Sequence, residues 1–145
     1  MCSSDLDVRR AAVGALGYAT GEQVVPALTH ALKDSSWQVR EEAASTLGKV
    51  KPRDAVDKLI YAMEDSYWQV RICAIRSLGR MKAREAVGAL CEALEHTISN
   101  VRKESAIALG EIGDAKAIPA LQKARQDADP DVRKLALLAL ASITK

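Results

Sequence analysis

The chain has 145 residues, of which 48% are apolar, with no Phe and only two Trp and three Tyr. That length suits one domain of ordinary size, with a core built from Ala, Leu, Val and Ile. Charged residues make up 28% of the chain and nearly cancel, which leaves a net charge of +2. The charge therefore provides no global attraction to nucleic acid or to an anionic membrane. The sequence has no run of about 18 apolar residues, which a membrane span needs, and no export signal. We therefore expect a cytoplasmic protein without membrane contact.

The first six residues, Met1–Leu6, resemble the in-frame translation of a common sequencing adapter. We therefore expect residues 1–6 to be a non-native leader on a reading frame cut from environmental sequence data. In that case Cys2 has no role, and the working array extends beyond this chain. The first predicted helix belongs to half a unit, residues 5–18.

The dipeptide Val-Arg then recurs every 31 residues with no insertion, at Val8-Arg9, Val39-Arg40, Val70-Arg71, Val101-Arg102 and Val132-Arg133. A Leu column keeps the same step, and a Gly column follows it, at Gly17, Gly48, Gly79 and Gly110. A fixed period of this length is the signature of a repeat architecture. After the half unit we place four units at residues 19–49, 50–80, 81–111 and 112–145, all within a single repeat domain, 1–145.

Each unit contains two predicted helices, helix A at about residues 22–33 and helix B at about residues 37–49 of the first full unit. Val25, Leu28 and Leu32 have the i, i+3, i+7 spacing of one helix face, and a second such set begins at Val39. The intervening Asp34-Ser35-Ser36 predicts an N-cap for helix B, and Gly48 predicts a tight turn at its end. Strand patterns are absent. The sequence thus predicts an all-α protein of about nine helices, in which each antiparallel helix pair is stabilised by stacking on the next.

The string Asp-Ser-x-x-x-Val-Arg-x-x-Ala-x-x-x-Leu-Gly, with Ala-Val-x-x-Leu in helix A, resembles the short HEAT-like repeats of the phycobiliprotein-lyase class. The resemblance covers the chain from about residue 5 to residue 145. It implies a right-handed α-solenoid, a HEAT-like or ARM-type superhelix whose B helices line a concave face. Because one repeat type serves unrelated functions, the resemblance specifies the fold more strongly than the activity.

The resemblance also implies a ladder in which an Asp before helix B pairs with the Arg six residues later. The matching pairs are Asp34 with Arg40, Asp65 with Arg71, and Asp127 with Arg133. His96 takes the place of the Asp before Arg102, which puts that rung in doubt. A row of five arginines also fits a phosphate-binding surface. Since most of them have an acidic partner, we favour the structural interpretation, hydrogen bonds that fix one unit to the next.

The columns of helix B that break the repeat predict where a partner binds. Trp37 and Trp68 occupy one such column, and exposed tryptophans are favoured in binding hot spots. The alternative is that each ring folds over the loop between helices and seals the neighbouring unit. The predicted partner-binding residues are Trp37, Gln38, Glu41, Trp68, Gln69, Ile72, Arg76, Lys103 and Ile107.

A basic ridge repeats at the C-terminal end of two successive B helices, as Lys49, Lys51 and Arg53 and then Arg80, Lys82 and Arg84. Such cations complement the helix dipole, which is the interpretation we favour. The functional alternative is a docking patch for an acidic partner or a phosphate backbone.

Catalysis finds little support in the sequence. His30 and His96 belong to no metal-ligand cluster, and the chain has only the reversed Glu95-His96 where a related HEAT-like hydroxylase has paired His-Glu dipeptides. Cys73 and Cys91 fit no zinc or redox spacing, so we expect free thiols. We predict no catalytic residue, no metal and no cofactor.

The last predicted helix, Val132–Ile143, is apolar on more than one side, because Leu135, Leu137 and Leu138 add to its core positions. This predicts a docked partner or self-association through Leu135 and Leu138. Our leading hypothesis is a non-catalytic scaffold that binds a protein or peptide on the helix-B face. The resemblance implies one alternative, a subunit of a bilin lyase or isomerase, and a HEAT-like nucleic-acid-binding module is a further one.

Overall fold

The computed structural model describes residues 3–145, and within that range it contains nine α-helices, four short 3-10 helices and no strand. The predicted all-α class is therefore confirmed. The chain divides into two compact halves, residues 1–77 and 78–145, which are described separately below. Cys2, and with it part of the predicted leader, lies outside the described residues.

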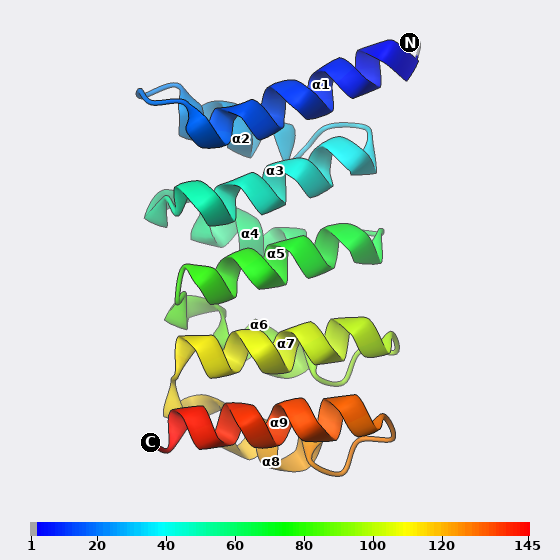
Figure 1. The fold of residues 1–145 in the computed structure, drawn as a ribbon, viewed down its shortest axis with the longest axis vertical. Helices are drawn as coiled ribbons and strands as arrows, with labels where there is room; N and C mark the ends of the chain where they lie inside the picture. Colours follow the sequence, from blue (N-terminus) through cyan, green and yellow to red (C-terminus); the bar gives the residue numbers. More distant parts are fainter. Residues whose placement is uncertain (1–2) are drawn as a thin grey trace. The chain divides into compact units, whose positions relative to one another are not determined.

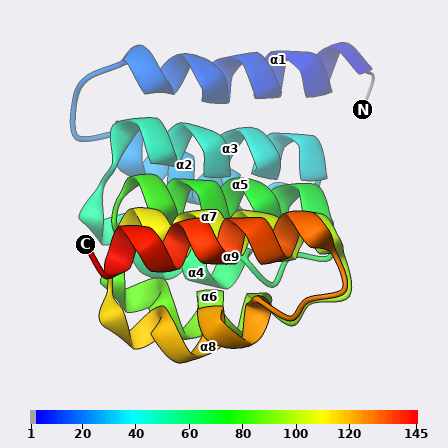
Figure 2. The same ribbon diagram turned by 60° about the horizontal axis from the view of Figure 1, so that its bottom comes forward.

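The N-terminal half consists of consecutive A and B helices joined by short turns (Figure 1). Its B helices form one layer and its A helices the layer behind it (Figure 2). The B helices are α1 (Ser3–Ala15), α3 (Trp37–Val50) and the first part of α5 (Trp68–Arg80), and the A helices are α2 (Val24–Ala31) and α4 (Val56–Ala62). The 3-10 helices are η1 (Leu16–Tyr18) and η2 (Arg53–Ala55).

The C-terminal half repeats this arrangement, and α7 and α9 run side by side in Figure 1. A 3-10 turn leads directly into each of its A helices, so helix A starts about one turn earlier than its α-helical part. The B helices are α7 (Ser99–Ile112) and α9 (Pro130–Ile143), and the A helices are α6 (Val87–Ala93) and α8 (Ile118–Ala124). The 3-10 turns are η3 (Arg84–Ala86) and η4 (Ala115–Ala117).

The repeated apolar columns form the core of both halves. Leu28, Leu47 and Leu59 are fully buried in the first, and Leu90 and Leu109 in the second. Burying one such side chain stabilises the fold by roughly 1.5–3 kcal/mol. Because a helix pair offers few of these residues, the stacking of consecutive pairs supplies the rest.

The turn before helix B uses the predicted residues in a different way. The side chain of Ser36, the N-cap residue of α3, makes no capping hydrogen bond. Instead Asp34 Oδ1 accepts a hydrogen bond from the backbone N–H of Ser36, at 2.9 Å. The predicted triplet Asp34-Ser35-Ser36 thus contains the N-cap residue, but the carboxylate of Asp34, and not the hydroxyl of Ser36, closes this turn.

Contrary to the prediction, Gly48, Gly79 and Gly110 do not end their B helices but lie inside α3, α5 and α7, whereas Gly17 lies in η1, after α1. A Cβ on Gly48 would lie 2.9 Å from the Cβ of Ser77 and would also meet its Oγ, and one on Gly110 would lie 3.1 Å from the Cα of Ala139. The left-handed residues that do end these helices are Lys51 and Gly113. Gly48 and Gly110 are thus required by the close approach of consecutive B helices, since any side chain there would push the helices apart.

Candidate functional site

The arginine column makes hydrogen bonds from one repeat to the next. Arg40 Nε donates to Asp65 Oδ2 at 2.7 Å, and Arg102 Nε donates to Asp127 Oδ2 at 2.9 Å, each across 25 residues. Their side chains are both only 15% exposed. Hydrogen bonding to Asp65 raises the pKa of Arg40, although burial opposes the shift. These guanidinium groups are therefore engaged inside each half and not presented as a phosphate-binding surface.

The pairs proposed from the six-residue spacing need a correction. Arg40 and Arg133 each donate to the backbone carbonyl of the Asp six residues earlier, at 2.7 Å. The carboxylates of Asp34, Asp65 and Asp127 instead bind the arginine of the preceding repeat. The reason is local, because the Asp side chain turns back to close its own loop and its remaining oxygen faces the preceding B helix.

His96 preserves the turn that its aspartate counterparts form. Its Nδ1 accepts a hydrogen bond from the backbone N–H of Ile98 at 3.0 Å, and its carbonyl accepts one from Arg102 at 2.8 Å. A neutral imidazole nitrogen is an acceptor, as a carboxylate oxygen is. The replacement therefore keeps the bonds that hold the start of α7.

An aromatic cluster lies at the N-terminal ends of α3 and α5, formed by Trp37, Tyr67 and Trp68. Trp37 stacks on Tyr67, with ring centroids 5.4 Å apart and planes inclined by 17°. The guanidinium carbon of Arg40 lies 5.8 Å from the centroid of the Tyr67 ring. Tyr67 remains 45% exposed and Trp68 39% exposed. The two tryptophans thus differ, since Trp37 packs onto the next repeat while Trp68 is presented to solvent.

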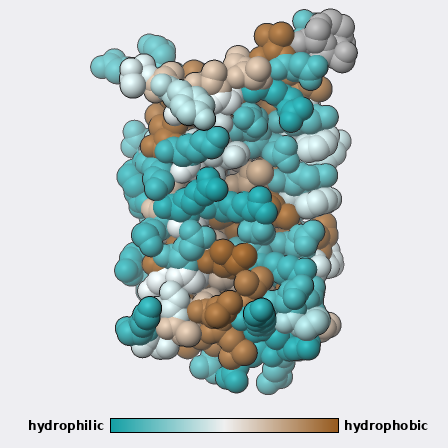
Figure 3. Space-filling model, viewed as in Figure 1, coloured by the Kyte–Doolittle hydropathy of each residue, from teal (hydrophilic) through white to brown (hydrophobic). Residues whose placement is uncertain are grey.

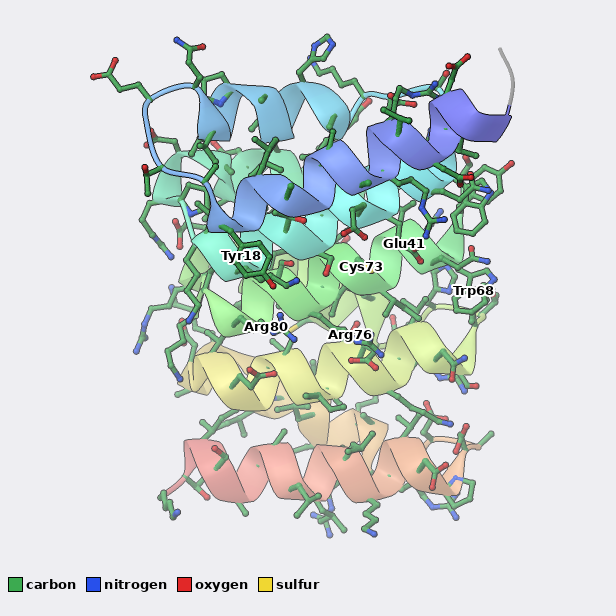
Figure 4. The ribbon with its side chains drawn as sticks, turned by 45° about the horizontal axis from the view of Figure 1, so that its top comes forward. Tyr18, Glu41, Trp68, Cys73, Arg76 and Arg80 are labelled. Carbon is green, nitrogen blue, oxygen red and sulfur yellow. The ribbon has the colours of Figure 1, made fainter. Side chains whose placement is uncertain are left out.

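The other residues predicted for the N-terminal half divide by burial. Figure 4 shows Trp68 at one end of α5 and Arg76 two turns along the same helix, with Glu41 on α3. Arg76 is exposed, and Gln38, Glu41 and Gln69 are half-buried. Ile72 is only 7% exposed, so its placement on the binding surface is wrong. The same column holds the charged residues Glu41 and Lys103 in neighbouring repeats. The apolar side chain of Ile72 instead turns into the core, because its removal from water stabilises the fold.

In the C-terminal half, the predicted Lys103 and Ile107 lie along α7. Lys103 Nζ lies 3.3 Å from Asp131 Oδ2 and 3.7 Å from Asp129 Oδ2, so its charge is directed to the start of α9. Ile107 is exposed. Of these two residues, Ile107 presents the surface that a partner can bury.

Two members of the basic ridge contact the end of the next B helix, α7, and the turn that follows it. Lys82 Nζ donates to the carbonyl of Glu111 at 2.9 Å, and Arg84 Nη1 lies 3.6 Å from Asp114 Oδ2. In the N-terminal half, the stem of Lys49 packs near Gly17. Lys51 and Lys82 adopt the left-handed conformation that ends their helices. These contacts give the ridge a structural role that the sequence alone left open.

A pair of grooves that sequence analysis did not find lies beside the C-terminal ends of consecutive A helices. One, of about 270 Å³, is lined in the N-terminal half by Thr29, Lys58 and Tyr61 among others. Its counterpart two repeats later is larger, about 780 Å³, and is lined by Cys91, Ala120 and Lys123. At the position of Lys58 the larger groove has the smaller Ala120.

The thiol of Cys91, which lines the larger groove, is half-buried. Burial raises its pKa, and the nearby carboxylate of Asp114 adds to the shift. The thiol therefore stays protonated and is a poor nucleophile. Residues 3–145 hold no group of three or more potential metal ligands, and no helix among them is long and apolar enough to cross a membrane.

The stacked helix pairs and the inter-repeat ladder define an α-solenoid. The chain belongs to the HEAT-repeat family, which matches residues 2–68 and 56–141.

Solved structures agree with this assignment. The chain is 30% identical to a chain of the CpcE–CpcF complex of phycocyanin lyase from Nostoc sp. PCC7120, with a TM-score of 0.85, over 97% of this chain and 61% of that one. It is 28% identical to human deoxyhypusine hydroxylase, with a TM-score of 0.75, over 86% of this chain and 45% of that one. A designed armadillo repeat protein for modular peptide recognition, 20% identical over 92% of this chain and 73% of its own, shares the fold with a TM-score of 0.62.

The resemblance to the repeats of the phycobiliprotein-lyase class is thereby confirmed. The chain spans 61% of the length of the lyase chain that it matches. Comparison with curated protein sequences gave no match.

Proposed function

We propose that the chain is a protein-binding HEAT-repeat module whose contact surface is centred on Trp68. The observation that carries this proposal is the 39% exposure of the Trp68 side chain beside the exposed Tyr67 ring. Exposed tryptophan and tyrosine offer a large apolar contact area at a low cost in conformational entropy, and tryptophan is enriched in binding hot spots.

The surroundings of Trp68 support a peptide or protein partner rather than a small molecule. The stack with Trp37 and the nearby Arg40 hold the Tyr67 ring in place, so the surface is preorganised. Preorganisation reduces the entropy lost on binding. Gln38, Glu41 and Arg76 supply polar groups on the same two helices, as the rim of a protein interface requires. Lys103 and Ile107 belong to the proposed contact set of the C-terminal half.

The two tryptophans offer a matched pair of variants. Peptides are first selected from a random-peptide phage library against the unchanged chain, and their affinities are then measured by fluorescence anisotropy. We expect Trp68→Ala to weaken them by at least about tenfold, which is 1.4 kcal/mol, with a smaller fall in melting temperature than Trp37→Ala causes. Trp37→Ala should instead lower the stability by about 0.5–1.5 kcal/mol for the lost ring stack, and further for the apolar area that the indole no longer buries.

Two results would count against the proposal. Selected peptides that bind Trp68→Ala as tightly as the unchanged chain would exclude Trp68 as the contact. A fall in melting temperature for Trp68→Ala as large as that for Trp37→Ala would assign the ring a packing role.

A second candidate function is that of a bilin lyase subunit. It rests on the 30% identity to the lyase chain over 97% of this chain. To test it, the chain is incubated with free bilin and phycobiliprotein subunits, once with CpcE and once with CpcF, since the solved lyase is a complex of these two. We expect a covalent bilin adduct with its visible absorbance in one of the two mixtures. No adduct in either, while CpcE and CpcF together form one, would rule this candidate out.

A further inference from the structure

An open apolar groove runs between α7 and α9 in the C-terminal half, on the face formed by the B helices. It measures about 320 Å³. Figure 3 shows the apolar surface gathered over these two helices, with polar surface around it. The apolar lining consists of Ala106, Ile107, Gly110, Leu135, Leu138 and Ala139.

The groove has a floor of small residues and walls of branched ones. A Cβ on Gly110 would lie 3.1 Å from the Cα of Ala139, so the two helices approach closely along this line. Ile107 and Leu138 rise from the two sides, and Leu138 is 57% exposed. The close approach keeps the floor rigid, while the walls leave apolar surface in contact with water.

Stacking does not require this apolar surface, as the corresponding helices of the N-terminal half show. Between α1 and α3 the carboxylate of Glu42 lies 2.5 Å from a Cβ placed on Gly14, and the stem of Lys49 lies near Gly17. Charged side chains therefore fill the equivalent groove. In α9 the equivalent positions are Leu135 and Ser142, which leave it open and apolar.

Both ends of the groove carry negative charge. At one end Glu111 lines it and is exposed, and no ion pair engages its carboxylate among the residues that the structure describes. The backbone carbonyls at the end of α7 add to this negative end. Beyond the other end, two carboxylates, Asp129 and Asp131, share the single ammonium group of Lys103.

We propose that this groove binds an amphipathic α-helix of a protein partner, with apolar residues at i, i+3 or i+4, and i+7 facing the groove and Lys or Arg at both of its ends. A helix in a groove presents anchors at this spacing. The basic ends complement Glu111 and the Asp129–Asp131 pair. This site is separate from the Trp68 surface of the N-terminal half, so either can fail without the other.

Two adjacent leucines of α9 provide the test. Leu138 lines the groove, whereas Leu137, which is 49% exposed, does not. A displayed library of 16-residue alanine-based helical peptides, with apolar and charged positions randomised, is selected against the unchanged chain. We expect an apolar stripe with basic ends in the recovered peptides. Leu138→Gln should weaken them by about tenfold to a hundredfold, the effect of losing one buried leucine, while Leu137→Gln leaves their affinity unchanged.

Charge and self-association supply the remaining readouts. Glu111→Gln should reduce the preference for a basic end, with Glu92→Gln on α6 as the control. The proposal is overturned by failure to recover any peptide, by acidic ends, or by equal effects of the two leucine variants. A dimer in light scattering that Leu138→Gln dissociates would make a second copy of this chain the occupant and would likewise overturn it.

Discussion

Where an aspartate precedes helix B, as Asp127 precedes α9, that one side chain combines two structural tasks. Asp127 Oδ1 accepts a hydrogen bond from the backbone N–H of Asp129 at 2.8 Å, which closes the turn. Both carboxylate oxygens of Asp127 also accept hydrogen bonds from the guanidinium of Arg102. One side chain thus fixes both the start of α9 and its attachment to α7. The resemblance predicted that the aspartate and an arginine form a ladder, but not that the carboxylate reaches the arginine of the preceding repeat. Spacing along the chain does not specify where the second carboxylate oxygen points.

These contacts predict how stability depends on pH. Burial alone would raise the pKa of Asp127, but the bonds from Arg102 and the Asp129 N–H, with the charges of Arg102 and Arg133, lower it. Since the folded pKa lies below the unfolded value of about 3.9, the stabilisation is present above that value and is lost as the pH falls through the folded pKa.

We therefore expect Asp127→Asn to cost about 1.5–3 kcal/mol at pH 7, the contribution of charge-assisted hydrogen bonds. The free energy of unfolding, measured in urea, should differ less from that of the unchanged chain as the pH falls below about 4. Asp57→Asn, at an exposed position in the first turn of α4, is the control. A deficit for Asp127→Asn that stays constant between pH 7 and pH 3 would contradict this account.

At the scale of the helix, periodicity predicted the elements well, whereas the interpretation of individual end residues did less well. The apolar spacing placed helix B at about 37–49, and α3 runs from Trp37 to Val50. Gly48 was misread as a helix end because a glycine has the same appearance in sequence whether it allows a left-handed turn or a close approach. Only the position of Ser77, 29 residues away, distinguishes the two.

The same limit applies to the candidate surfaces. The tryptophan column was visible in the sequence, but the division of labour between Trp37 and Trp68 depends on Tyr67, which stacks on the first and leaves the second exposed. Ile72 was assigned to the surface because its column breaks the repeat, but its side chain is buried. A position in the repeat predicts which way a side chain points from its helix, whereas the packing of that particular side chain decides how exposed it is.

At the scale of the whole chain, the columns that form the core differ from the columns that form the candidate binding surfaces. Inner members of a column that hardly changes, such as Leu47 and Leu109, are fully buried. The columns that change hold the aromatic cluster in the N-terminal half and the apolar groove in the C-terminal half. Since each repeat of a solenoid is stabilised mainly by its neighbours, a local change should have a local effect.

Leu47 and Leu109 test this expectation, because they occupy one column, are equally buried and lie in different halves. Replacing either by Ala should cost about 2–5 kcal/mol, the sum of lost burial and a cavity. Amide hydrogen exchange should then show where the loss is felt. We expect Leu109→Ala to speed exchange in α7, α8 and α9 more than in α2 and α3, and Leu47→Ala to do the reverse. If both variants instead accelerated exchange equally along the chain, the two halves would unfold as one cooperative unit, and the nearest-neighbour description would fail for this protein.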